Sequence, residues 1–197
     1  MRQRIRAARR ELDASARHAA GLRVAGQLAQ IGLPRPRSRV GVYLPMDGEL
    51  DTAAVIALAR RRRCDVYLPV VTSFSARHMR FARLTGLRSV RPNRWGIHEP
   101  EGVGIGGRWL DLVLVPCVAF DTGGVRLGMG AGFYDRHFGF LLRRASWQRP
   151  RLVGLAYDFQ RVASLEPAPW DVPLWGIVTE AGVYGHAAVL RRNHQTE

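Results

Sequence analysis

A glycine-rich segment that contains one arginine is the part of the chain best suited to bind a phosphate group. It reads DTGGVRLGMGAGFYD and runs from Asp121 to Asp135. Glycines at alternate positions let the backbone approach a ligand without a Cβ in the way, and Arg126 can bind two phosphate oxygens at once. The segment leaves a predicted strand and enters a predicted helix near Gly132, where turn amides and the helix dipole favour an anion. The alternative is that these glycines only make a tight turn.

A second glycine-rich stretch, at residues 102–107, matches the pattern G-x-G-x-x-G letter for letter. That fingerprint binds a dinucleotide when it follows a strand and opens a helix, because the pyrophosphate then meets helix N–H groups. Here the stretch precedes a predicted strand instead. We interpret it as a loop.

Strands that are apolar throughout alternate with helices along the chain. Such runs predict strands at residues 39–45, 65–71, 110–116 and 151–157, and one last strand within 176–184. Helical spacing predicts one long or two short helices over 2–31, with Asp13 able to cap the second, a helix over 53–63 capped by Thr52, and a helix that contains Tyr134 and Phe138. Residues 77–84 alternate like an exposed strand, and residues 86–107 are rich in loops. The pattern predicts a mostly parallel sheet with helices on both faces.

Basic residues outnumber acidic ones by 30 to 16, which gives a formal net charge of +14, and all of the basic residues are arginine. The absence of lysine excludes a Schiff base, a pyridoxal-phosphate anchor and the phosphate loop G-x-x-x-x-G-K-[ST]. Any phosphate must therefore be held by arginine and backbone amides. So basic a chain could alternatively be a nucleic-acid-binding module, whose affinity would fall steeply with salt.

Length, cysteines and hydropathy set the expected class of protein. A chain of 197 residues can form one domain, which we place at 1–190, followed by a polar tail at 191–197. Cys64 and Cys117 form neither a C-x-x-C pair nor half of a zinc site, which is typical of a reducing compartment. No apolar stretch approaches the ~20 residues that a membrane span requires, and no secretory signal is evident. We expect a cytoplasmic monomer with no membrane or specific nucleic-acid partner.

Four segments together resemble the 5-formyltetrahydrofolate cyclo-ligase family, also called methenyltetrahydrofolate synthetase. They are YLPMDGELDT at 43–52, VPCVAFDTGGVRLGMGAGFYDR at 115–136, GLAYDFQ at 154–160 and WDVPLWGIVTE at 170–180. The resemblance implies a three-layer α/β/α fold with an N-terminal helical segment. It also implies an ATP- and Mg²⁺-dependent cyclisation of 5-formyltetrahydrofolate to 5,10-methenyltetrahydrofolate through phosphorylation of the formyl oxygen, with release of ADP and phosphate. A different kinase or ligase on the same scaffold is a further alternative, because a fold does not determine a substrate.

The resemblance implies ATP contacts at both the N-terminus and the glycine segment. Arg2 and Arg6 fall where family members usually read K-x-x-L-R, with arginine here in place of the lysine. On sequence alone, the pattern of the arginines within residues 2–10 favours a solvated helical face. The contacts in the glycine segment fall on Arg126, Leu127, Gly128, Met129, Gly130, Ala131, Gly132, Phe133 and Tyr134.

Arg126 and Tyr134 are the candidate catalytic residues of this set. Ala131 and Phe133 stand where the family commonly has glycine and tyrosine. Because alanine tolerates a positive φ poorly, we expect Ala131 to have a negative φ.

The remaining candidates would bind folate and the metal. Glu49 falls on the family's folate-binding glutamate and Leu44 on a neighbouring substrate contact, and a carboxylate can accept two bonds from the paired donors of a pterin. Trp95 could stack on the pterin or aminobenzoyl ring, although most aromatic side chains simply pack. Asp135 and Asp171 fall on the family's metal-associated aspartates, and Mg²⁺ needs only one or two carboxylates beside nucleotide phosphates. Without a metal, Asp135 would suit the first turn of its helix and Asp171 a turn.

Overall fold

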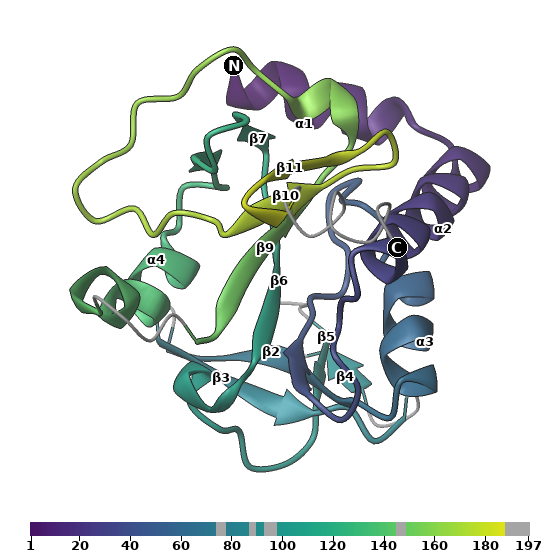
Figure 1. The fold of residues 1–197 in the computed structure, drawn as a ribbon, viewed down its shortest axis with the longest axis vertical. Coiled ribbons are helices and arrows are strands. Elements are labelled where there is room, and N and C mark those ends of the chain that lie inside the picture. The colour runs from purple at the N-terminus through teal and green to yellow at the C-terminus, as the bar shows by residue number, and fades with distance from the viewer. Residues whose placement is uncertain (74–77, 87–89, 93–97, 145–148, 188–197) are drawn as a thin grey trace, which may run out of the picture.

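A seven-stranded sheet, five strands of which run parallel, forms the centre of the molecule (Figure 1). The computed structural model describes residues 1–73, 78–86, 90–92, 98–144 and 149–187. The strand order is β11-β10-β9-β6-β1-β2-β3, and the outer strands β11 and β3 pair antiparallel with their neighbours. The sheet strands are β1 (Arg39–Gly41), β2 (Asp65–Ser73), β3 (His78–Arg83), β6 (Leu112–Pro116), β9 (Arg151–Leu155), β10 (Gly176–Val178) and β11 (Val183–Gly185).

Helices cover both faces of the sheet, which confirms the α/β class. Figure 1 shows α2 and α3 on one side of the sheet and α4 on the other, with α1 crossing near β7. Their bounds are α1 (Arg2–Glu11), α2 (Ala14–Gln30), α3 (Ala53–Arg61) and α4 (Phe133–Phe138). Shorter elements are the 3-10 turns η2 (Gly107–Trp109), η3 (Gly139–Arg143) and η4 (Asp158–Gln160), and the strand pairs β4 (Val90–Pro92) with β5 (His98–Pro100) and β7 (Ala119–Phe120) with β8 (Arg126–Leu127).

Successive side chains of β6 point to opposite faces of the sheet, so this one strand contributes to two hydrophobic cores. Leu112 and Leu114 pack into the core beneath α2 and α3, while Val113 and Val115 pack into the core beneath α4. All four side chains are buried. An apolar run without polar alternation is what a strand covered on both faces requires.

Of three local predictions, one is confirmed and two are wrong. Asp13 caps α2 by accepting a hydrogen bond from the Ala16 amide at 2.7 Å. The Thr52 hydroxyl does not cap α3, because it donates instead to the Tyr43 carbonyl at 2.8 Å. The last predicted strand is a hairpin of β10 and β11, since the Thr179 hydroxyl accepts from the amides of Ala181 and Gly182 and bends the chain between them.

The sheet has a switch point between β1 and β6. The chain proceeds from β1 to β2 on one side and later returns to place β6 on the other side of β1. In open α/β sheets the crevice outside the carboxyl ends of such strands is where ligands bind. Among the described residues, no helix is both long and apolar enough to span a bilayer. The predicted polar tail lies outside the described residues.

Candidate active site

Two cavities meet at the glycine segment, just beyond the carboxyl ends of β1 and β6. The large cavity has a volume of about 970 Å³ and is lined by Arg2, Arg126, Leu127, Gly128, Gly130, Gly132, Asp135, Arg136, Gly139, Phe140, Leu142, Arg143, Pro169, Trp170 and Asp171. The apolar cavity, of about 330 Å³, is lined by Tyr43, Leu44, Pro45, Met46, Glu49, Leu68, Pro69, Val71, Met79, Pro116, Arg126, Gly128, Met129, Ala131, Gly132, Phe133, Tyr134 and Asp135. Arg126, Gly128, Gly132 and Asp135 line both cavities and so form a shared wall.

The backbone of the glycine segment has open space beside two of its residues. A Cβ added at Gly128 or Gly130 would meet no atom within 4 Å, and Gly130 has a φ of +100°. Gly132 precedes α4 with a φ of +67°, whereas Ala131 is not among the residues with positive φ, as predicted. Because α4 spans only six residues, the loop amides and Arg126 would matter more to a bound anion here than the helix dipole would.

Arg126 is fixed by hydrogen bonds on both sides of the wall. One Nη donates to the Val172 carbonyl and the other to Asp135 Oδ1, each at 2.5 Å. The Val172 amide also donates to Asp135 Oδ1, at 3.1 Å. With only 5% of its side chain exposed, Arg126 joins the glycine segment to the segment before β10 and places a positive charge between the cavities.

Asp135 and Asp171 both line the large cavity, and Asp135 is also one of the two partners of the Arg126 side chain. Asp171 Oδ2 accepts from the Ala168 amide at 2.9 Å, so one oxygen of each carboxylate is engaged by the protein. The described residues contain no group of three or more potential metal ligands. Two carboxylates beside a phosphate chain nevertheless suit Mg²⁺, which keeps several waters and rarely uses an all-protein cage.

Tyr134 lies in the wall of the apolar cavity and presents a neutral phenol there. Burial raises the pKa of Tyr134 well above its ordinary value of 10.0. Its ring stacks on Phe138 with 6.3 Å between ring centroids. The hydroxyl can therefore donate or accept a hydrogen bond, but it does not ionise at neutral pH.

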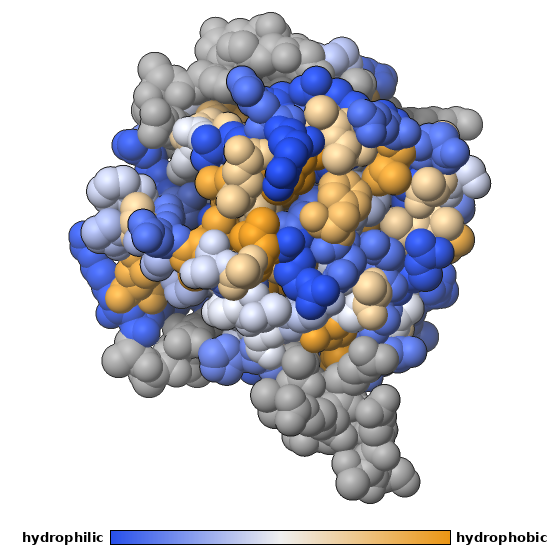
Figure 2. All heavy atoms as spheres, turned by 90° about the horizontal axis from the view of Figure 1, so that it is seen from above, coloured by the Kyte–Doolittle hydropathy of each residue, from blue (hydrophilic) through white to orange (hydrophobic). Residues whose placement is uncertain are grey.

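Glu49 is the buried acid of the apolar cavity, not the exposed loop residue that a lone glutamate usually is. It is 9% exposed, and its Oε2 accepts from the Met46 amide at 3.1 Å. Burial raises the pKa of Glu49 from 4.5 to about 7, although Arg9 and Arg6 act in the opposite direction. Leu44 lines the same cavity. Apolar side chains reach the surface between hydrophilic ones on the side of the molecule that carries α1 (Figure 2), and the exposed Met46 and Met129 belong to this cavity's rim.

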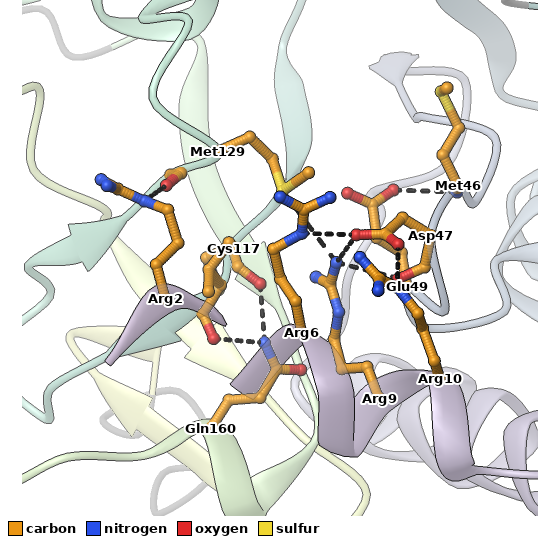
Figure 3. Close-up of polar contacts among 12 residues, drawn as sticks. Arg2, Arg6, Arg9, Arg10, Met46, Asp47, Glu49, Cys117, Met129 and Gln160 are labelled. Carbon is orange, nitrogen blue, oxygen red and sulfur yellow. Dashed lines mark hydrogen bonds and ion pairs between the residues drawn. The ribbon is translucent and has the colours of Figure 1, made fainter. Parts of the chain in front are cut away.

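Helix α1 forms hydrogen bonds with the glycine segment and with the loop that carries Glu49 (Figure 3). Arg2 Nε donates to the Gly128 carbonyl at 2.8 Å and borders the large cavity. Arg6, the other predicted nucleotide contact, lines neither cavity and instead donates to Asp47 Oδ2 at 2.6 Å. Arg2 is therefore brought to the glycine segment, while Arg6 is brought to the loop that carries Glu49.

Asp47 and Arg9 attach α1 to the loop that carries Glu49, and neither residue was expected from the sequence. Arg6, Arg9 and Arg10 all converge on the Asp47 carboxylate, as Figure 3 shows. The Arg9 side chain is 1% exposed and also donates to the Asp47 carbonyl at 3.0 Å. The only signal in the sequence is that these arginines recur on one helical face, a pattern shared by many solvated helices.

We expect the substitution Asp47→Asn to lower the free energy of unfolding by about 1–2 kcal/mol at pH 7, after allowance for partial exposure. The hydrogen bond from Arg10 holds the pKa of Asp47 at about 2, below its ordinary 3.8. The carboxylate thus stabilises the fold above pH 3.8, and this contribution is lost as the pH falls through about 2. Urea unfolding at several pH values measures the effect.

The matched control for this prediction is Asp65→Asn, which removes an exposed ion pair with Arg83. Exposed pairs contribute about 0–1 kcal/mol. Equal losses in the two variants would show that Asp47 is an ordinary surface acid.

The Gln160 side chain fixes the backbone that follows β6. Its Nε2 donates to the carbonyls of Cys117 and Val118 at 2.7 and 2.8 Å (Figure 3). The residue is 1% exposed. It therefore fixes the path from β6 into the glycine segment, a role that the sequence analysis did not assign. Trp95 lies outside the described residues, so its predicted stacking stays a prediction.

A mostly parallel α/β sheet with two cavities at its switch point has the arrangement in which open α/β sheets bind small ligands. The chain belongs to the 5-formyltetrahydrofolate cyclo-ligase family, whose model matches residues 1–180. This confirms the resemblance seen in its sequence motifs.

Named relatives and solved structures agree with this membership. The chain is 35% identical to a 5-formyltetrahydrofolate cyclo-ligase of Haemophilus influenzae, over 90% of this chain and 95% of the relative. It is 41% identical to one of Escherichia coli, over 74% of this chain and 79% of the relative. The NMR structure of the Aquifex aeolicus 5,10-methenyltetrahydrofolate synthetase has a TM-score of 0.75 at 30% identity, covering 93% of this chain and 90% of that one.

Proposed function

We propose that this protein cyclises 5-formyltetrahydrofolate to 5,10-methenyltetrahydrofolate in a reaction that consumes ATP, requires Mg²⁺ and releases ADP and phosphate. The observation that carries the proposal is the shared wall: the glycine segment borders one cavity with Arg2 and Asp171 and another with Glu49. A phosphate donor and a phosphate acceptor can therefore bind on opposite sides of one loop.

The chemistry of the linings supports one ligand for each cavity. The large cavity is lined by four arginines and by glycine amides, which suits the phosphates of ATP. The apolar cavity is lined mostly by apolar side chains with Glu49 at one end, which suits a flat pterin. The Glu49 carboxylate would accept two bonds from the ring N–H and the exocyclic amine of the pterin.

The reaction needs activation because a formamide carbonyl is a weak electrophile and its oxygen is a poor leaving group. In the proposed sequence the formyl oxygen attacks the γ-phosphorus, the bond from that phosphorus to the bridging oxygen breaks, and ADP leaves. The N10 amine then attacks the activated formyl carbon, its proton is lost to solvent, and phosphate departs with the former formyl oxygen. Atoms and charge balance without a nucleophile from the protein.

The protein's part is to align the two ligands and to stabilise the charge on the transferring phosphoryl group. Glycine amides of the shared wall would bind phosphate oxygens, and Arg126 would supply positive charge from a fixed position. The neutral Tyr134 hydroxyl would hydrogen bond to the ligand in the apolar cavity. Asp135 and Asp171 would hold Mg²⁺, which neutralises phosphate charge when bound.

The direct test mixes purified protein with 5-formyltetrahydrofolate, ATP and Mg²⁺ and follows the near-ultraviolet absorbance of the methenyl product. We expect product only when all three are present, and we expect EDTA to stop its formation. Absence of product with all components present would contradict the proposal. ATP consumption that depends on another substrate, and not on this folate, would favour a different kinase or ligase. The cytoplasmic location and the monomeric state stay predictions.

A further inference from the structure

A third cavity lies at the opposite edge of the sheet from the candidate active site. Its volume is about 580 Å³, and we call it the arginine cavity after its lining: Leu33, Arg35, Pro36, Arg37, Ser38, Asp111, Leu112, Arg149, Arg151 and Trp175. Ser38 precedes β1, Leu112 begins β6 and Arg151 begins β9. Because these strands are parallel, the cavity adjoins their amino ends, away from the glycine segment.

The charge of the arginine cavity is strongly positive. Four arginines line it, and Asp111 is the one acidic residue among its lining residues. Both Asp111 oxygens are already engaged, Oδ1 with Arg149 at 3.1 Å and Oδ2 with the Arg39 amide at 2.9 Å. The carboxylate therefore neutralises one of the four guanidinium groups at most.

The cavity is also built from fixed parts. The Arg151 guanidinium lies 4.4 Å from the centre of the Trp175 ring, and burial together with the charges of Arg35 and Arg149 lowers the pKa of Arg151. The loop that carries Arg35 is fastened by its carbonyl, which accepts from the Ser38 hydroxyl at 2.7 Å and from the Cys64 thiol at 3.1 Å. Like charges held together in this way favour an anion that brings them a counter-charge.

We propose that the arginine cavity binds a small anion with several phosphate charges, such as inorganic triphosphate or the phosphate chain of a nucleotide. Guanidinium groups bind phosphate through paired hydrogen bonds and stay protonated when buried. The volume lies within the range of small-molecule sites, which is about 300–1,000 Å³. This site is separate from the proposed catalytic function and does not depend on it.

The test titrates inorganic triphosphate into isotope-labelled protein at constant ionic strength and follows backbone amide signals by NMR. The amides of Ser38 and Leu112 report on the arginine cavity, and those of Gly128 and Gly130 report on the candidate active site. We expect saturable shifts at Ser38 and Leu112. Absence of saturation there would overturn the proposal, whatever the active-site amides show.

The deciding variant is the double substitution Arg35→Gln with Arg37→Gln. Both arginines are exposed, so we expect the variant protein to fold. We expect the Kd reported by Ser38 and Leu112 to rise by about tenfold or more, and that reported by Gly128 and Gly130 to change by less than about twofold. The control is Arg23→Gln with Arg80→Gln, two exposed arginines that line none of the three cavities and remove the same charge. Equal weakening by both pairs would show only a general charge effect and would overturn the proposal.

Two further ligands distinguish the possible sources of the phosphate. We expect ATP and triphosphate to shift Ser38 and Leu112 with Kd values within about threefold of each other, because the phosphates carry the recognition. A short single-stranded RNA that binds this cavity more tightly than triphosphate would replace the small-anion proposal with nucleic-acid binding.

Discussion

Replacing Glu49 with glutamine is expected to lower kcat/KM for 5-formyltetrahydrofolate by about 100-fold, because a neutral amide cannot make the two charged hydrogen bonds that we propose between the carboxylate and the pterin. A glutamine offers one acceptor oxygen and turns an NH₂ group toward the donors of the ring. The loss should appear mainly in KM for the folate, while KM for ATP changes little. Steady-state kinetics with each substrate varied in turn measures both values.

The same substitution should stabilise the protein at alkaline pH. Since burial raises the pKa of Glu49 from 4.5 to about 7, the folded state binds the proton more tightly than the unfolded state does. The free energy of unfolding of the wild type therefore falls as the pH rises from 4.5 to about 7 and then levels. Above that range, Glu49→Gln should be more stable by up to about 3 kcal/mol.

The control for both effects is Glu166→Gln, which changes an exposed glutamate outside the cavities. It should alter neither the kinetics nor the pH dependence of unfolding. A Glu49→Gln enzyme with wild-type kcat/KM for the folate would remove this carboxylate from substrate binding.

The substitution Arg126→Ala is expected to reduce kcat by about 1,000-fold, the largest kinetic effect that the structure suggests. It removes a fixed positive charge between the two cavities and releases Asp135 from its partner. It should also lower the free energy of unfolding by about 3 kcal/mol, because a largely buried ion pair is broken. Single-turnover measurements with saturating ATP and folate separate the chemical step from binding.

Arg126→Lys and Asp135→Asn keep this prediction testable if the alanine variant does not fold. Lysine keeps the charge but cannot donate to Val172 and Asp135 in the same fork, so we expect an intermediate kcat. In Asp135→Asn the side-chain oxygen can still accept from the Val172 amide, while the negative charge is lost. Wild-type kcat in all three variants would show that this bridge takes no part in the reaction.

The fold was largely predictable because its strands are apolar throughout and are separated by helical patterns. The prediction failed where local chemistry decided the outcome. A single run of residues at 176–184 is a hairpin because the Thr179 side chain binds two following amides. The Thr52 hydroxyl faces the Tyr43 carbonyl because the residue is fully buried. Neither fact is visible in hydrophobic periodicity.

From residue pattern alone, the candidate site was predictable only in the glycine segment. The family resemblance added four further residues that line the two cavities: Arg2, Leu44, Glu49 and Asp171. The glycine segment combines small residues with an arginine at a strand's carboxyl end, and the structure places it beside two cavities. Asp47 and Arg9, by contrast, gain their importance from contact between α1 and a loop 38 residues away. A long-range ion cluster of this kind has no characteristic spacing in the sequence, so only the structure identifies it.

If ATP and folate bind on the two faces of the shared wall, as proposed, their affinities should be coupled. An adjustment of residues 126–135 on ATP binding would change the space and charge offered to the folate, and thermodynamic reciprocity would then require the folate to alter the ATP affinity by the same factor. Substitutions in the shared wall should therefore change the dissociation constants of both ligands. Substitutions that line only one cavity should change mainly the dissociation constant of the ligand in that cavity.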